Sequence, residues 1–310
     1  MIISKPKFWD NKIGIYSIIF LPLTLIILVY IFFKKKFTKE INFNIPIICV
    51  GNIYIGGTGK TPTSILIANE LSNLGKNPVI VRKYYENHKD EHDLILSKFS
   101  SLILNDSRIK GIEEAIKKRY DTIILDDGFQ EYKIKKKLNI VCFNKNQLIG
   151  NGLVIPSGPL RENLKSLVKA DIVLVNGGKD ENFEKKILKI NKNLKIFYSS
   201  YEPLNINEFK NKNLIAIASI GNPSNFFKLL EDHNLNIKKK LIYPDHHNFS
   251  KKQVENIILD AEKNDYHIIM TEKDFSKFKN HKTNRLNYLK VALNLEKSEK
   301  FIQRIKEVYA

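Results

Sequence analysis

Cysteine is scarce in this chain: only Cys49 and Cys142 occur among its 310 residues. Both lie inside apolar runs, which predicts small buried side chains in a reducing compartment and excludes a disulfide framework. Cysteine and histidine spacing typical of a zinc site is also absent. The sequence contains no internal repeat and no long linker, and its length is enough for two domains or one large one.

Acidic residues are few relative to basic ones. The chain has 33 Asp and Glu against 51 Lys and Arg, which gives a formal net charge of +18. This excess predicts attraction to anionic partners, such as nucleic acid, phosphorylated substrates or an anionic membrane surface. A general compositional bias toward lysine, asparagine and isoleucine is the alternative explanation. Charge alone does not select among these partners.

One long apolar run lies near the amino terminus. No residue from Ile13 to Phe33 is charged, and at about 1.5 Å per helical residue this run just crosses a hydrocarbon core of about 30 Å. We therefore expect an N-terminal membrane helix. No small-residue cleavage site follows it, so a removable signal peptide is the weaker interpretation. Because Pro22 predicts a kink, an anchor that dips into one leaflet is the alternative to a full span.

The stretch VGNIYIGGTGKTP, residues 50–62, predicts a nucleotide-binding P-loop between a buried strand and a helix. The strict pattern G-x-x-x-x-G-K-[ST] requires a glycine where this chain has Tyr54. The physical requirements are still met, because glycines let the backbone curl around phosphates, a lysine supplies charge and a threonine hydroxyl binds magnesium. A glycine-rich turn with a chance Gly-Lys-Thr is the alternative. The predicted ATP-binding residues are Gly56, Gly57, Thr58, Gly59, Lys60 and Thr61.

Strands and helices alternate along the rest of the chain, whereas residues 82–93 are too charged to belong to a core. The alternation predicts an α/β fold with a P-loop NTPase-like parallel sheet that is covered on both faces. A second βα series from about residue 179 predicts a smaller α/β domain. The expected organisation is a membrane anchor at 1–36, a P-loop kinase domain at 37–178 and a C-terminal domain at 179–310.

Two carboxylates, Asp126 and Asp127, end the apolar run TIILDD. Acids at the carboxyl edge of a parallel sheet lie where ligands of open α/β sheets bind. A magnesium ion held between a P-loop hydroxyl and such an acid is a general need of phosphoryl transfer. We therefore predict Mg²⁺ ligands at Thr61, Asp126 and Asp127, with a turn at the end of a strand as the alternative for the two acids.

Several short motifs follow one another in an order that covers nearly the whole chain. They are an amino-terminal FWD, then GGTGKTP, DDGFQ (126–130), GNGLVIPSGPLRE (150–162), YPDHHNF (243–249) and TEKD (271–274). This ordered set resembles the tetraacyldisaccharide 4′-kinases, the lipid A kinases. The P-loop of that family also lacks the first glycine, so the resemblance implies that Tyr54 is a family variant.

The resemblance implies a phosphotransferase that uses ATP and Mg²⁺ to phosphorylate the 4′-hydroxyl of a tetraacylated glucosamine disaccharide 1-phosphate in lipid A biosynthesis. It implies a lipid substrate in the inner leaflet of the bacterial inner membrane, with the catalytic domains on the cytoplasmic face. Neither nucleic acid nor an obligate protein partner is expected. A membrane anchor suits such a substrate, because extracting a lipid from the bilayer costs about 0.8 kcal/mol per methylene.

The resemblance also implies a base for the sugar hydroxyl, which is barely acidic and needs a proton acceptor as the phosphorus–oxygen bond forms. The Asp-Glu pair of the family maps onto Asp90 and Glu91, and a histidine of its second domain maps onto His246, with His247 as the second candidate. From the residues alone, Asp90 is a solvated loop charge and the histidines form a turn or a helix cap.

This chain departs from the family pattern on both sides of the Asp-Glu pair. The usual glycine before it and proline after it are replaced by Lys89 and His92. The preceding Arg-Gly-Tyr-Gly stretch survives only as Arg82 and Tyr84. The Asp-Glu pair itself is retained.

Glu91 and four further residues are expected to contact phosphate or substrate. Arg108 occupies the place of a phosphate-facing arginine in the family, and Gln130 completes DDGFQ. Arg161 and Glu162 follow a rigid Gly-Pro turn that could present an arginine fork to phosphate, with a surface salt bridge as the alternative. Asp274 either positions nucleotide or a second metal, or belongs to a helix N-cap box.

Two rival functions are distinguishable by experiment. A membrane-tethered P-loop ATPase would consume ATP without a lipid acceptor and would be indifferent to Asp90→Ala. A basic scaffold at the membrane surface would bind anionic lipid or nucleic acid in a salt-dependent way that Lys60→Ala would not change.

Overall fold

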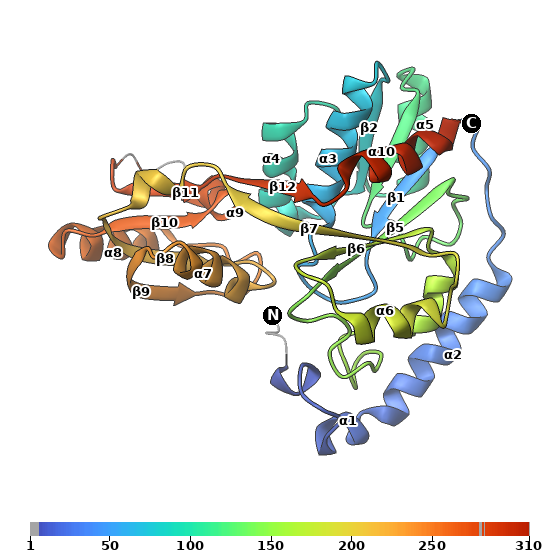
Figure 1. Ribbon diagram of the computed structural model, residues 1–310, viewed down its shortest axis with the longest axis horizontal. Helices are drawn as coiled ribbons and strands as arrows, with labels where there is room; N and C mark the ends of the chain where they lie inside the picture. The colour runs from blue at the N-terminus through green and yellow to red at the C-terminus, as the bar shows by residue number, and fades with distance from the viewer. Residues whose placement is uncertain (1–5, 279–280, 282, 310) are drawn as a thin grey trace. The chain divides into compact units, whose positions relative to one another are not determined.

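The computed structural model describes residues 6–278, 281 and 283–309, and the chain forms two compact units (Figure 1). The larger unit comprises Lys5–Tyr84, Phe99–Ser200 and Leu293–Ala310. The smaller unit comprises Tyr85–Lys98 and Tyr201–Ala292, together with the terminal residues Met1–Ser4, which lie outside the described part. Residues 179–200 and 293–310, expected in the C-terminal domain, thus group with the larger unit, and residues 85–98 group with the smaller one.

The larger unit is built on an eight-stranded sheet. Its strand order is β12-β7-β6-β5-β1-β4-β2-β3, and the pairings from β7 to β3 are parallel. The strands are β1 (Ile47–Gly51), β2 (Pro78–Lys83), β3 (Leu102–Asn105), β4 (Thr122–Asp126), β5 (Leu138–Asn144), β6 (Ile172–Asn176), β7 (Lys195–Pro203) and β12 (Val291–Leu295). The helices are α1 (Ile15–Ile19), α2 (Leu21–Phe37), α3 (Lys60–Asn73), α5 (Arg108–Lys117), α6 (Glu181–Leu188) and α10 (Ser298–Lys306).

The smaller unit is built on a four-stranded parallel sheet with the order β11-β10-β8-β9. Its strands are β8 (Asn213–Ala218), β9 (Asn236–Ile242), β10 (His267–Thr271) and β11 (Leu286–Leu289). Its helices are α4 (Lys89–Lys98), α7 (Pro223–Asp232), α8 (Lys251–Lys263) and α9 (Glu272–Phe275). The chain passes from one unit to the other after Tyr84 and after Lys98, and again within β7 and within β12.

Both faces of the smaller sheet are covered, because side chains of a strand alternate between its faces. Residues 214, 216 and 218 of β8 pack in one cluster with Phe226 and Leu230 of α7. Residues 215 and 217 pack in a second cluster with Val254 and Ile257 of α8. The α/β class and the parallel sheets predicted from the sequence are therefore confirmed.

The charged stretch 82–93 was predicted to lie outside any core, and this is wrong for part of it. Arg82 is 5% exposed and ends the buried run of β2, and Asp90 and His92 are each 5% exposed on α4. Strand β9 was not predicted, because its sequence NIKKKLI has three consecutive lysines, which stay exposed at an edge of the sheet. Such edge lysines are a common means of preventing edge-to-edge pairing.

The amino-terminal apolar run is not one helix. It divides at Phe20 into α1 and the 17-residue α2, with Pro22 in the first turn of α2. In the part of the chain that the structure describes, no helix has both the length and the apolar character needed to span a bilayer. The predicted membrane-spanning helix is therefore not supported, since the run is interrupted near the proline. Residues 1–5 of the expected anchor lie outside the described residues.

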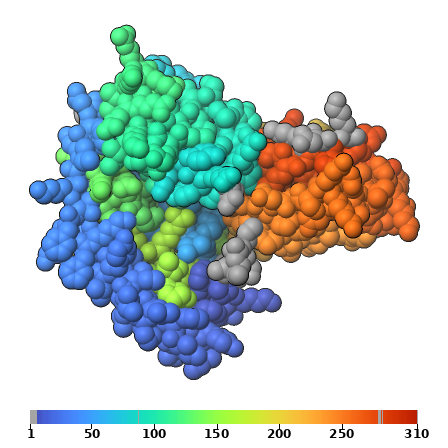
Figure 2. All heavy atoms as spheres, turned by 180° about the vertical axis from the view of Figure 1, so that it is seen from behind, coloured from blue at the N-terminus to red at the C-terminus, as the bar shows by residue number. Residues whose placement is uncertain are grey.

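Helix α2 is held to the larger unit by one polar side chain within its apolar sequence. The hydroxyl of Thr24 is 3% exposed and donates to Ser157 Oγ at 2.8 Å, while it accepts from the Ser157 backbone N–H at 3.1 Å. Ile27 and Leu28 pack against the core on the same side. The N-terminal segment therefore lies along the surface of this unit, where Figure 2 shows it in blue.

Tyr54 has a structural role that explains the missing glycine. Its ring is fully buried, and its hydroxyl donates to Asp10 Oδ1 of the FWD motif at 2.7 Å. Trp9 of the same motif donates its indole N–H to the Pro156 carbonyl at 2.9 Å. Gly150 permits this packing, because a Cβ there would meet the Trp9 carbonyl at 2.5 Å. The FWD motif thus ties the amino terminus to the nucleotide loop and to the 150–162 loop.

Candidate functional site

The predicted nucleotide loop lies between β1 and α3, at the carboxyl edge of the larger sheet. Gly56 and Gly59 have φ values of 125° and 88°, which other residues rarely adopt, and α3 begins at Lys60 directly after Gly59. Asn52 ties the loop together, since its side-chain amide donates to Thr58 Oγ1 at 3.0 Å and to the Gly56 carbonyl at 3.3 Å. The backbone N–H groups at the start of α3 form an anion-binding end of the kind that receives phosphate.

Asp126 lies at the end of β4, beside this loop, and is fully buried. Its Oδ2 accepts from Thr61 Oγ1 at 3.2 Å, and its Oδ1 accepts from Ser64 Oγ at 3.0 Å. The guanidinium of Arg82 forms an ion pair with the same Oδ2. The sequence predicted Asp126 and Thr61 as site residues, but it did not identify Ser64 and gave Arg82 no role. The signal that could have identified Arg82 is its position near the end of β2, the strand adjacent to β4.

Asp127 is surrounded by cations. Arg161 Nη1 donates to its two carboxylate oxygens at 2.8 and 3.1 Å, Lys60 Nζ lies 3.6 Å from Oδ1, and Arg108 Nη2 donates to its carbonyl at 2.6 Å. Burial alone would raise the pKa of the Asp127 carboxyl, but the charges of Lys60 and Arg161 outweigh it and hold the pKa well below its usual range. Burial lowers the pKa of the Lys60 ammonium, which Asp127 partly opposes. Lys60 and Arg161 thus meet at the Asp127 carboxylate, and Arg108 binds the main-chain carbonyl of the same residue.

The residues present fit an ATP–magnesium group. Thr61 Oγ1 and Asp126 Oδ2 are hard oxygen donors 3.2 Å apart. Two adjacent ligands of an octahedral magnesium ion, each about 2.0–2.1 Å from the metal, are separated by about 2.9 Å. The threonine hydroxyl and the carboxylate therefore already have nearly the spacing that such an ion requires.

Gln130 and Glu162, also predicted as substrate contacts, lie in the larger unit but have different surroundings. Gln130 donates to the Asn52 carbonyl at 2.8 Å and accepts from Arg161 at 3.4 Å, so it belongs to the phosphate-loop network. Glu162 is 2% exposed and pairs with Lys35 of α2. Its contacts favour the attachment of α2 to the larger unit, so its assignment to substrate stays a prediction.

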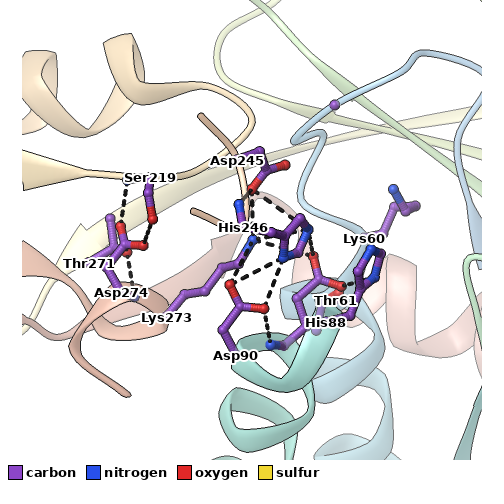
Figure 3. A network of polar contacts seen from close by, with 12 residues as sticks. Lys60, Thr61, His88, Asp90, Ser219, Asp245, His246, Thr271, Lys273 and Asp274 are labelled. Carbon is purple, nitrogen blue, oxygen red and sulfur yellow. Dashed lines mark hydrogen bonds and ion pairs between the residues drawn. The ribbon is translucent and has the colours of Figure 1, made fainter. Parts of the chain in front are cut away.

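Asp90 and His246 are brought together within the smaller unit, although 156 positions separate them in the sequence (Figure 3). Asp90 lies in the first turn of α4 after the chain enters this unit, and His246 follows β9 in the DHH turn. His246 Nδ1 lies 2.9 Å from Asp90 Oδ1 and 3.2 Å from Oδ2. The histidine has φ of 58°, a left-handed backbone that is rare outside glycine and that aims its ring at Asp90.

The charge state of Asp90 follows from its surroundings. Burial would raise the pKa of this carboxyl, but the hydrogen bond with His246 and the charges of Lys273 and Lys277 outweigh it and hold the pKa well below its ordinary value of 3.8. Asp90 is therefore a carboxylate at neutral pH. The stability that these contacts contribute is present above pH 3.8 and is lost as the pH falls toward the depressed pKa.

Two lysines of the TEKD segment and the helical turn after it face the Asp90–His246 pair. Lys273 Nζ lies 2.9 Å from Asp245 Oδ1 and 3.5 Å from His246 Nε2, and Lys277 Nζ lies 3.2 Å from Asp90 Oδ2. Nε2 also lies 3.6 Å from Glu91 Oε1 and 3.7 Å from Asp245 Oδ1. In the neutral tautomer in which Nδ1 donates to Asp90, as in other carboxylate–histidine pairs, Nε2 is the acceptor nitrogen.

Asp274 positions Lys277 rather than reaching outward. It is fully buried, accepts from the Ser219 backbone N–H at 2.9 Å and from Thr271 Oγ1 at 2.8 Å, and pairs with Lys277 at 3.2 Å. Thr271 in turn accepts from the Asp274 backbone N–H, which is the N-cap arrangement considered for this motif. Asp274 thus connects the end of β8 to the lysine that faces Asp90.

His88, Glu91 and His246 include the donor atoms of a possible metal site, with ligand atoms within 4.8 Å of one another. The rings of His88 and His246, however, are stacked at 4.2 Å with an interplanar angle of 4°. Because an imidazole lone pair lies in the plane of its ring, two parallel rings do not direct their lone pairs at one ion. His247, the second candidate for the base, stacks instead on Tyr243 at 4.8 Å.

A model of the family described as tetraacyldisaccharide-1-P 4′-kinase matches residues 16–310. The tetraacyldisaccharide 4′-kinase of Pelagibacter ubique is 40% identical over 98% of both chains. The enzyme of the same name from Francisella tularensis subsp. novicida is 32% identical over 94% of this chain and 97% of its own.

One solved structure shares the fold over most of the chain. It is LpxK from Aquifex aeolicus in complex with ATP, with a TM-score of 0.72 and 24% sequence identity. The match covers 95% of this chain and 99% of that one. The arrangement of strands and helices described above is therefore shared with that structure.

Proposed function

Because the chain belongs to the tetraacyldisaccharide-1-P 4′-kinase family, we propose that it transfers the γ-phosphoryl group of ATP to the 4′-hydroxyl of a tetraacylated glucosamine disaccharide 1-phosphate. The observation that carries this proposal is the family match over residues 16–310. The LpxK structure with a related fold was solved with ATP, and the same nucleotide suits the loop at Gly56–Thr61.

The larger unit supplies the phosphate end of the reaction. The N–H groups at the start of α3 and the ammonium of Lys60 bind the phosphate oxygens, and Arg161 and Arg108 add positive charge near Asp127. Thr61 and Asp126 would hold Mg²⁺, with Asp127 beside them. When bound, the ion neutralises charge on the transferring phosphoryl group.

The smaller unit supplies the proton acceptor. Asp90 accepts the Nδ1 proton of His246 and so leaves Nε2 as the base. As the acceptor oxygen of the sugar attacks phosphorus, its proton passes to Nε2, the bond between the γ-phosphorus and ADP breaks, and ADP departs. Lys273, which lies 3.5 Å from Nε2 in the free protein, has to yield this position to the hydroxyl.

The test is transfer of labelled γ-phosphate from ATP to the tetraacylated disaccharide 1-phosphate in detergent micelles. Labelled lipid that depends on both ATP and the acceptor is the expected result. If ATP is consumed at the same rate with and without acceptor and no lipid is labelled, the chain is an ATPase and the proposal fails.

The substrate class places the reaction at a lipid surface, and the N-terminal segment is suited to one. Side chains of α1 and α2 that face away from the larger unit are apolar and exposed, such as Ile15 at 65%, Ile19 at 60% and Ile26 at 65%. Lys34, Lys35 and Lys36 follow at the end of α2. We infer that this segment dips into the cytoplasmic leaflet of the bacterial inner membrane, with its lysines near anionic headgroups.

Replacing Ile19 and Ile26 by glutamate is expected to weaken binding to phosphatidylglycerol-containing vesicles by about tenfold or more per substitution. A buried isoleucine contributes roughly 1.5–3 kcal/mol, and about 1.4 kcal/mol is a factor of ten. Vesicle co-sedimentation measures this. Leu259→Glu is the matched control, because Leu259 on α8 is also 60% exposed but lies in the smaller unit. Equal losses in all variants would contradict docking through α1 and α2.

A further inference from the structure

The sheet edge with the nucleotide loop already holds a cation between the two oxygens assigned to magnesium. Arg82 Nη1 lies 3.3 Å from Thr61 Oγ1 and 2.5 Å from Asp126 Oδ2, and those two oxygens are 3.2 Å apart. Arg82 is 5% exposed and Asp126 is fully buried. The three groups form a closed triangle in the larger unit.

A divalent ion coordinated by both Thr61 Oγ1 and Asp126 Oδ2 would share these oxygens with Arg82 Nη1. An ion about 2.0–2.1 Å from each oxygen would lie within a few ångströms of the guanidinium, and two cations at that separation repel strongly in a buried site. A buried carboxylate with no counterion is also unfavourable. Asp126 is therefore best satisfied by one cation at a time.

We propose that Arg82 is a built-in competitor for magnesium: its guanidinium neutralises Asp126 in the free protein and leaves Thr61 and Asp126 when the metal–nucleotide complex binds. The inference rests on the proposed function only in requiring that this loop binds magnesium-ATP. In this proposal Arg82 does not contact the metal but sets the affinity of the site for it. The free protein then binds divalent ions weakly, and the nucleotide phosphates recruit the metal.

The position of Arg82 is tested on the wild-type protein, which avoids any effect of a substitution on folding. Crystals of the full chain with Mn²⁺ and ADP would locate the metal by its anomalous scattering. We expect manganese within ligand distance of Thr61, with the Arg82 guanidinium moved off Asp126. Manganese bound at Thr61 with the Arg82–Asp126 ion pair intact would overturn the proposal while leaving the kinase function in place. Failure of the protein to bind Mn²⁺-ADP at all would instead contradict the proposed ATP site.

Metal affinity provides a second readout that is independent of catalysis. Mn²⁺ binding to the nucleotide-free protein, measured by electron paramagnetic resonance of the free ion, is expected to be at least tenfold tighter in Arg82→Gln than in the wild type. Lys83→Gln removes the same charge from the adjacent residue, whose side chain points to the opposite face of β2, and should bind Mn²⁺ as the wild type does. Thermal unfolding establishes that the variants are folded. The proposal would be overturned if the Mn²⁺ affinity of Arg82→Gln were within twofold of the wild-type affinity. It would also be overturned if Arg82→Gln and Lys83→Gln raised the Mn²⁺ affinity equally.

Discussion

Replacing Asp90 by asparagine is expected to lower kcat for phosphoryl transfer by about 10²–10⁴, the usual contribution of a positioned acid–base group, with the KM for ATP changed little. Asparagine keeps the shape of the side chain but loses the charge that accepts the Nδ1 proton of His246. Its amide can donate to Nδ1, which would move the imidazole proton to Nε2 and remove the base. The KM for ATP is expected to stay close to the wild-type value, because Asp90 does not belong to the nucleotide loop.

A double-mutant cycle separates a shared catalytic role from independent ones. If Asp90 and His246 act as one unit, Asp90→Asn, His246→Gln and the double variant should lose similar amounts of activity, because the second change removes nothing further. Asp93→Asn is the matched control, since it makes the same chemical change on the same helix α4. Additive losses would contradict the dyad, and so would an Asp90→Asn protein that retained most of its kcat.

The sheet and the nucleotide loop were predictable from the sequence because their signals are local. A buried strand, a glycine-rich turn and a helix follow one another at 47–73, and the period of each pattern is visible without knowledge of the remaining fold. The acids at the end of β4 were predictable for a related reason, since a parallel sheet places the carboxyl ends of its strands at one edge. These inferences needed only short-range patterns and general topology.

The surroundings of Asp90 were not predictable from local pattern. The polarity of residues 82–93 indicated an exposed stretch, yet Arg82 and Asp90 are both buried. Each is buried because a partner distant in sequence neutralises it, Asp126 for Arg82 and His246 with two lysines for Asp90. Only the family resemblance identified Asp90 and His246, and the pairing of Arg82 with Asp126 was not apparent from spacing.

The amino-terminal run shows the opposite error. Hydropathy alone favours one membrane-spanning helix, since the run has no charge from Ile13 to Phe33. Hydropathy does not register that Thr24 has polar partners at Val154 and Ser157, which place one side of α2 against protein. A segment that is apolar all round but half covered by its own chain has the average composition of a transmembrane helix without the geometry of one.

Replacing Lys60 by methionine is expected to reduce kcat/KM for ATP by about 10³ or more. Loss of a single preorganised charge at a transition state commonly costs about 10²–10³, and this lysine also contributes to binding the ground state of ATP. Methionine retains the length of the side chain and removes only its charge. Steady-state transfer assays, together with calorimetric titration of ADP, measure the two contributions.

Folding should survive this substitution, which makes the kinetic loss interpretable. Asp127 would keep the contacts of Arg161 at 2.8 and 3.1 Å, so its carboxylate is not left unpaired when the ammonium 3.6 Å away is removed. Lys110→Met on α5 is the matched control, because that side chain is 63% exposed and pairs only with Asp106 among the contacts described. If Lys60→Met retained ADP affinity and transfer activity within about fivefold of the wild type, the phosphates would not bind at this loop. The P-loop assignment would then fail, and with it the assignment of magnesium to Thr61 and Asp126.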